Sequence, residues 1–102
     1  MIKINPKGIK AWVTFTFEPH GEVSSVAVAG DWNDWEPEPM KRKKDGSFYL
    51  RKYLLMGRNY EFRYLIDGTH WVNDAHAPHV NNPYGSQNSL LELEGEIEAA
   101  EE

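Results

Sequence analysis

Hydrophobic and polar residues alternate along much of the chain, a pattern typical of β-strands that bury one face. In residues 11–17, Val13, Phe15 and Phe17 share one face, and the residues between them share the other. The same period of two runs through residues 60–66, where every second side chain is Tyr, Phe or Ile. Outside the C-terminal tail, no window of ten residues has a convincing helical stripe. The pattern predicts an all-β chain.

Turn residues between these segments predict how the strands connect. Asp45-Gly46 comes just before a predicted strand at residues 48–55 and favours a hairpin with residues 40–44. Asp67-Gly68 ends the strand at residues 60–66 and predicts a tight hairpin with a short returning strand. Both Asp-Gly turns therefore indicate that the strands they connect are antiparallel neighbours in a sheet.

Two more strands are predicted at residues 23–30 and 89–93, which makes about seven short strands in all. Such a set in roughly 100 residues favours a two-sheet, immunoglobulin-like antiparallel β-sandwich. A chain of 102 residues and 11.8 kDa can hold one core and is too short for two ordinary domains. We assign the sandwich to residues 10–93, an N-terminal extension to 1–9, and an acidic tail or linker to 94–102.

The charge balance bears on the class of partner. The formal charge is −5, but six of the sixteen acidic residues are glutamates between residues 92 and 102. Without them, eleven basic and ten acidic residues leave a balance of +1. A nearly neutral body argues against a nucleic-acid partner. The basic cluster at residues 41–44 is interpreted as a solvated strand edge.

Composition also indicates a compartment. The chain has no cysteine, which excludes disulfides and thiolate chemistry and fits a reducing compartment. It has no apolar run of signal-peptide length, and none near the roughly 20 residues of a membrane helix. We therefore expect a cytoplasmic protein with no membrane partner.

The candidates for catalytic and metal chemistry are weak. Glycoside hydrolysis needs two carboxylates across a cleft, and the possible pairs, Asp31 with Asp34 and Asp67 with Asp74, lie in segments that read as turns. Three histidines near Asp74 match no metal-ligand signature and are interpreted as part of a solvated loop. No catalytic residue, metal or cofactor is predicted, and we do not expect an enzyme.

The tryptophans carry the clearest functional signal. The chain has four, and Trp35 and Trp71 fall in polar, turn-rich contexts, whereas Trp12 and Trp32 are expected in core or hairpin packing. Sugar rings present apolar faces to flat aromatic side chains, and amides or guanidinium groups bind their hydroxyls. Trp35 and Trp71 are therefore predicted to be sugar platforms. Polar side chains of the right types are Asn33, Arg63, Gln87 and Asn88.

Three stretches, residues 26–35, 64–74 and 84–89, resemble in order and spacing the family 48 carbohydrate-binding modules. This family includes the glycogen-binding domain of AMP-activated protein kinase β subunits and the N-terminal modules of glycogen branching and starch debranching enzymes. The resemblance covers residues 10–93 and implies an early-set immunoglobulin-like sandwich that binds glycogen or starch.

The resemblance also implies roles for individual residues. Trp35 occupies the place of the tryptophan that stacks on glucose, and Trp71 that of a second platform. Arg63 stands where the family commonly has a lysine. Tyr84 replaces a leucine that threads the glucan ring, and is expected to stack instead. Ser86 and Asn88 match a threonine and a sugar-binding asparagine.

We therefore predict non-catalytic binding of α-1,4-linked glucans through an aromatic surface. The residues assigned to this site are Trp35, Arg63, Trp71, Tyr84, Ser86 and Asn88. An alternative from the same residues is a packing or interaction module, whose aromatic face docks onto a glucan-active enzyme or a kinase-like domain. An autonomous hydrolase is the third and least favoured hypothesis, because no carboxylate pair supports it.

Overall fold

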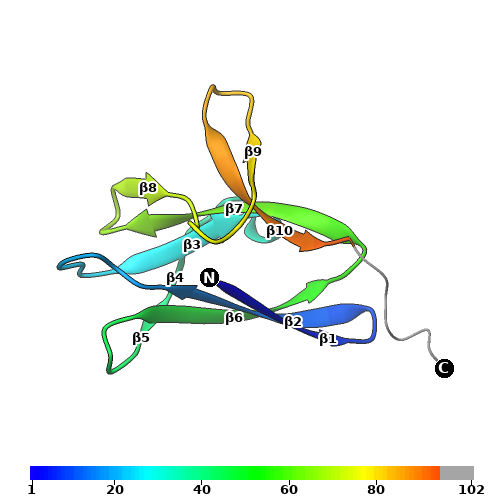
Figure 1. Ribbon diagram of the computed structural model, residues 1–102, viewed down its shortest axis with the longest axis horizontal. Coiled ribbons are helices and arrows are strands. Elements are labelled where there is room, and N and C mark those ends of the chain that lie inside the picture. The colour runs from blue at the N-terminus through cyan, green and yellow to red at the C-terminus, as the bar shows by residue number, and fades with distance from the viewer. Residues whose placement is uncertain (95–102) are drawn as a thin grey trace.

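In the computed structural model, which describes residues 1–94, two antiparallel β-sheets pack face to face as a sandwich (Figure 1). The four-stranded sheet has the order β1 (Ile2–Lys7), β2 (Lys10–Phe17), β6 (Phe48–Leu55) and β5 (Lys41–Arg42). The six-stranded sheet has the order β4 (Glu38–Pro39), β3 (Val26–Gly30), β7 (Arg58–Ile66), β10 (Gln87–Leu93) and β9 (His79–Asn81), and β8 (His70–Val72) also pairs with β7. A short 3-10 helix, η1 (Asp31–Asn33), follows β3. The predicted all-β antiparallel sandwich is confirmed.

The core lies between the two sheets and consists of the inward halves of the alternating strands. Val13 and Phe15 from β2 meet Phe62 and Tyr64 from β7, and all four are fully buried. The ring centroids of Phe15 and Phe62 lie 5.2 Å apart, edge to face. Each such side chain contributes about 2 to 3 kcal/mol through burial. The alternation read from the sequence thus gives the core.

Both predicted hairpins are present. β5 pairs with β6, and Asp45 in the turn accepts a hydrogen bond of 3.0 Å from the backbone N–H of Ser47. Between β7 and β8, Asp67 and Gly68 have φ angles of 51° and 74°, the left-handed pair of a type I′ turn. The N–H of Thr69 closes this turn on the carbonyl of Ile66 at 3.1 Å.

The structure adds strands that the sequence pattern did not predict. Residues 2–7, in the segment assigned to an N-terminal extension, form β1 and pair along their whole length with β2. β9 is also new, and β3 begins at Val26, not at residue 23. Residues 95–102, most of the predicted tail, lie outside the described residues. Within residues 1–94 there is no helix long and apolar enough to cross a membrane.

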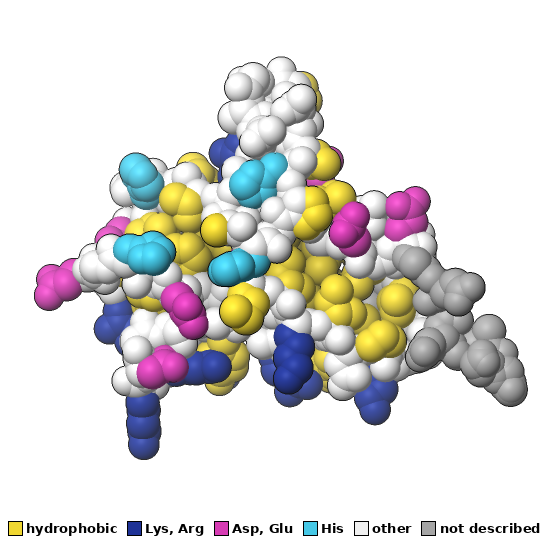
Figure 2. Space-filling view, in the orientation of Figure 1, with side chains coloured by type: hydrophobic (Ala, Val, Ile, Leu, Met, Phe, Trp, Pro, Cys, Tyr) yellow, Lys and Arg dark blue, Asp and Glu magenta, His cyan; other side chains and the backbone are white. Residues whose placement is uncertain are grey.

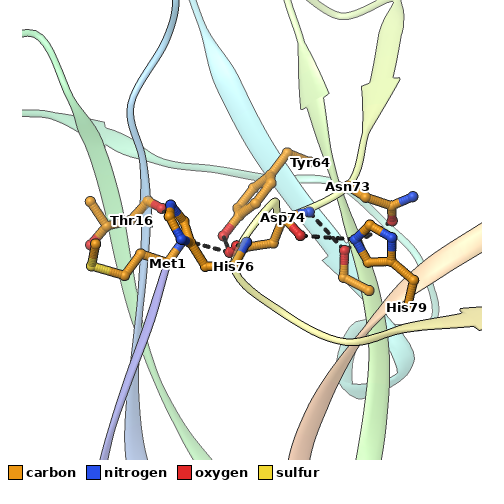
Figure 3. Close-up of polar contacts among 8 residues, drawn as sticks. Met1, Thr16, Tyr64, Asn73, Asp74, His76 and His79 are labelled. Carbon is orange, nitrogen blue, oxygen red and sulfur yellow. Dashed lines mark hydrogen bonds and ion pairs between the residues drawn. The ribbon is translucent and has the colours of Figure 1, made fainter.

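The buried carboxylate of Asp74 ties the loop after β8 to both sheets (Figure 3). Its Oδ2 atom accepts hydrogen bonds from the Tyr64 hydroxyl at 2.8 Å and from the Met1 ammonium at 2.5 Å. Its Oδ1 atom accepts one from the N–H of His76 at 2.8 Å. Burial alone would raise the pKa of Asp74, but these three donors outweigh it and hold the pKa below its ordinary value.

Replacement of this carboxylate tests its contribution to stability. Asp74→Asn is expected to lower the free energy of unfolding by about 2 to 4 kcal/mol, because the Tyr64 hydroxyl and the Met1 ammonium lose their charged acceptor. Tyr64→Phe, which removes one donor only, is expected to cost about 1 kcal/mol. Guanidinium chloride unfolding at neutral pH measures both changes.

The pH dependence of stability follows from the same group. A carboxyl with a lowered pKa in the folded state stabilises the fold above its unfolded pKa of about 3.9. That contribution disappears as the pH falls through the folded-state pKa of Asp74. Unfolding of the wild-type chain at a series of pH values should therefore show a steeper acid loss than unfolding of Asp74→Asn. Parallel profiles for the two proteins would contradict this assignment.

Candidate functional site

An open groove of about 550 Å³ runs over the outer face of the six-stranded sheet. Its floor comes from the outward side chains of β7, and its walls come from the η1 turn, β8 and the loop between β9 and β10. All six residues assigned to the site from the sequence line this groove: Trp35, Arg63, Trp71, Tyr84, Ser86 and Asn88. Three further residues line it: Glu61, Asn82 and Pro83.

Trp35 enters the groove from a tight turn that depends on Gly30. A Cβ atom at Gly30 would lie 2.6 Å from the carbonyl oxygen of Glu61 and 2.9 Å from Cβ of Phe62, so only glycine fits. The chain then reverses, and the N–H of Trp35 donates to the carbonyl of Gly30 at 3.0 Å. Asp34 and Trp35 both have positive φ, 56° and 60°. This backbone costs about 1 to 2 kcal/mol per residue and presents the indole at the sheet surface.

Asp31 fixes the direction of the Trp35 ring. Its Oδ1 atom accepts a hydrogen bond of 3.0 Å from the indole Nε1–H of Trp35. Its Oδ2 atom accepts one of 2.8 Å from the backbone N–H of Glu61 in β7. One carboxylate therefore links the indole to the strand that forms the groove floor.

Glu38 holds the base of the same turn. Its carboxylate accepts hydrogen bonds from the Asn33 side chain at 2.9 Å, from the Trp32 indole at 3.3 Å and from Lys52 of the opposite sheet at 2.8 Å. Burial would raise the pKa of Glu38, but these donors outweigh it and lower the pKa. Asn33 is thus engaged in the turn and does not line the groove, although its residue type suggested a sugar contact.

Trp71 reaches the groove from β8 through the Asp67-Gly68 hairpin. It pairs with Leu65, an outward residue of β7, so its side chain lies on the same face as Arg63. The residue is 42 % exposed. Asp67 anchors the hairpin by accepting hydrogen bonds from the N–H groups of Ser24 and Ser25 at 2.8 and 3.0 Å. The indole is exposed, but the backbone beneath it is firmly held.

Asn82 organises the loop between β9 and β10. Its Oδ1 atom accepts hydrogen bonds from the backbone N–H groups of Tyr84 and Ser86 at 2.9 and 3.2 Å. Its Nδ2 atom donates to Ser86 Oγ at 2.9 Å and to Asn88 Oδ1 at 3.2 Å. Tyr84, which is 90 % exposed, belongs to this loop and lines the groove.

Arg63 and Glu61 of β7 form the floor of the groove. Arg63 donates from Nε to the carbonyl of Gln87 at 3.0 Å and from an Nη atom to Ser86 Oγ at 2.6 Å, so it tethers the loop to β7. Asn88 is buried and donates to Glu61 Oε1 at 2.9 Å. The groove therefore combines flat aromatic rings with hydrogen-bonding groups that are held in defined positions.

Sequence reasoning missed Glu61 and Asn82 as groove residues. The period of two on β7 places Glu61 on the face of Arg63, two positions away, and that signal was available. For Asn82 the sequence indicated only a turn, because the contacts that bring it to the groove form only in the folded loop. Gln87, named from the sequence as a polar partner, donates to Asn81 at 3.2 Å and does not line the groove.

The remaining candidates take part in local structure. Asp31, Asp67 and Asp74 all accept hydrogen bonds in turns or loops, as the sequence indicated. His79 lies with Nε2 3.0 Å from the carbonyl of Asp74 (Figure 3). Among residues 1–94, no three His, Asp or Glu side chains are arranged to hold a metal ion. Trp32 stacks on Phe15 at 5.0 Å, and Trp12 stacks on Tyr53 on the outer face of the four-stranded sheet.

The link from Asp31 to Trp35 gives a test of how the site is built. In Asp31→Asn the amide can accept only one of the two hydrogen bonds, so we expect a loss of about 1 kcal/mol in unfolding free energy. The Trp35 indole N–H should exchange faster with solvent and shift in an NMR spectrum.

Asp34→Asn is the matched control, with the same change of charge in the same turn. Asn tolerates the left-handed backbone of position 34, so stability and the Trp35 signal should stay unchanged. Equal effects of the two substitutions on the Trp35 indole would refute the positioning role of Asp31.

Comparison with protein families gives one match over most of the chain. A family described as the glycogen recognition site of AMP-activated protein kinase matches residues 13–99. The matched region contains η1, all six residues assigned to the groove from the sequence, and the strands that carry them. Comparison with curated proteins gave no match.

Proposed function

Since the chain belongs to the family of glycogen recognition domains of AMP-activated protein kinase, a carbohydrate-binding module of the family 48 type, we propose that its groove binds α-1,4-linked glucans. The family is one of non-catalytic binding domains. The observation that carries the proposal is the convergence of Trp35, Trp71 and Tyr84, which come from three separate segments, on one open groove.

The aromatic residues suit the apolar faces of glucose rings. Trp71 and Tyr84 are exposed and Trp35 is half-buried, although aromatic side chains of this size usually lie in the core. Their exposure around a single hollow indicates a ligand that covers them. We assign Trp35 and Trp71 as stacking platforms and Tyr84 as a third apolar contact.

The polar residues that line the groove suit the hydroxyl groups of the sugar. Asn88, Ser86 and the Nη atoms of Arg63 can donate, and Glu61 supplies acceptor oxygens. Their mutual hydrogen bonds hold them in place before ligand binds, which lowers the entropic cost of recognition. An open groove that orders few sugar units is expected to give a Kd of about 10 μM to 1 mM.

Glu61 is the one carboxylate among the described residues that line the groove. Glycoside hydrolysis commonly requires a second carboxylate across the scissile bond. The lining therefore favours binding without bond cleavage.

Loss of a platform is expected to weaken glucan binding while the protein stays folded. Trp35→Ala and Trp71→Ala should each raise the Kd for maltoheptaose about tenfold, because each removes one stacking contact worth roughly 1 kcal/mol or more with its buried area. Isothermal titration calorimetry and retention on glycogen measure the change.

Tyr53→Ala is the matched control, since Tyr53 is 44 % exposed, close to the 42 % of Trp71, but lies on the opposite sheet. It should bind maltoheptaose like the wild type. Full retention on glycogen by both tryptophan variants would contradict the assignment of this site.

The role of Arg63 can be separated from its charge. Arg63→Lys keeps the cation but cannot donate in parallel to Gln87 and Ser86, so the loop that carries Tyr84 loses its tether. We expect about a three- to fivefold weaker Kd for maltoheptaose, the equivalent of one lost hydrogen bond. If lysine supports full affinity, then the tether does not matter and the positive charge alone suffices.

A further inference from the structure

The face of the sandwich opposite the groove carries a concentration of positive charge. The strands β1, β2, β5 and β6 turn alternate side chains outward there, and the register places cationic residues from all four strands on this face. Figure 2 shows Lys and Arg side chains along the lower side of the molecule, beneath this sheet. We call this surface the basic face; its cations are Lys3, Lys7, Lys10, Lys41, Lys43 and Arg51.

Aromatic rings hold several of these cations in place. Trp12 and Tyr53, opposite each other on β2 and β6, stack with centroids 4.7 Å apart. The guanidinium of Arg51 lies 4.5 Å from the Trp12 ring, and the Lys10 ammonium lies 5.1 Å from the Tyr53 ring. Such contacts fix long side chains that would otherwise lose rotamer freedom on binding.

The strands of the basic face supply no compensating carboxylate, although Lys43 lies near enough to Asp45 in the adjoining turn to add to the hydrogen bonds from Ser47 in lowering the pKa of that carboxyl. The four strands contain no Asp or Glu, and among the described residues none of the six cations forms an ion pair within 4 Å. Lys7 and Lys10 stand directly opposite each other, an arrangement that costs stability. The fold therefore retains a repulsion that an anionic partner would relieve.

Protection of sheet edges explains only part of this pattern. Lysines on edge strands prevent pairing with other chains, and β1 and β5 are the two edges. Lys10 and Arg51 belong to the central strands β2 and β6, where no edge needs protection.

We propose that the basic face docks an acidic polypeptide segment of a partner protein. Carboxylates in an extended segment can meet cations spread over four strands. Nucleic acid and glucan fit less well, because both use free aromatic ring faces, and the rings of Trp12 and Tyr53 already contact each other and a cation. This face and the groove lie on the outer sides of different sheets, so the two partners would not compete.

Binding of a fluorescein-labelled oligoglutamate peptide to the full chain, followed by anisotropy, tests the proposal. Binding should be measurable at about 50 mM NaCl and much weaker at about 300 mM. Arg51→Gln should weaken it about three- to fivefold, and Lys10→Gln with Arg51→Gln about tenfold or more. Saturation with maltoheptaose, or Trp71→Ala, should leave the peptide affinity unchanged, so a failure of the glucan proposal would not affect this result.

Arg58→Gln is the matched control. Arg58 is an exposed arginine whose guanidinium lies 4.8 Å from the Tyr60 ring, but it belongs to β7 in the other sheet. It should bind the peptide like the wild type, and thermal unfolding should show all variants folded. If Arg51→Gln and Arg58→Gln weaken peptide binding equally, then binding depends on the net charge of the protein and not on the basic face, and the proposal is overturned. Tighter binding of an oligouridylate with the same number of charges would overturn it in favour of nucleic acid.

Discussion

The alternation of side chains along β7 is the constraint on which both the core and the groove depend. Phe62 and Tyr64 point inward and are completely buried, while Glu61 and Arg63 point outward to the groove floor. A shift of one residue in the register would exchange these two sets and destroy both at once. The strand pairs with β3, β8 and β10, so its register also sets the positions of the segments that carry Trp35, Trp71 and Asn88.

Hydrogen bonds hold the base of the groove in place, although two of its three aromatic residues, Trp71 and Tyr84, are exposed. Asp31 ties the Trp35 indole to the backbone of β7, and Arg63 ties the loop of Tyr84 to the same strand. The strained backbone at Trp35 persists because Gly30 and Glu38 hold the turn from both sides. Strain of this kind, held by its surroundings, is typical of binding sites. These contacts place the platforms before a ligand arrives.

The sequence predicted those parts of the fold that depend on residues adjacent in the chain. The Asp67-Gly68 turn and the alternation of residues 60–66 are of this kind, and the structure has both. β1 was not predicted, because five of its six residues are exposed and Pro6 lies within it, so its sequence has no strand signal of its own. It is a strand because it pairs with β2. The basic face was not predicted from the sequence for a related reason. The net charge of +1, counted without the six C-terminal glutamates, is a sum over the rest of the chain and says nothing of where the charges lie. Strand register brings lysines and arginines that are far apart in the sequence onto one sheet.

The most direct test of glucan binding at the groove is an NMR titration of the labelled chain with maltoheptaose, with cellohexaose as a control of different linkage. The account predicts shifts at the indole N–H groups of Trp35 and Trp71, and none at Trp12, with the α-linked sugar alone. A folded sample in which neither indole responds to maltoheptaose, or in which both sugars give the same shifts, would contradict it.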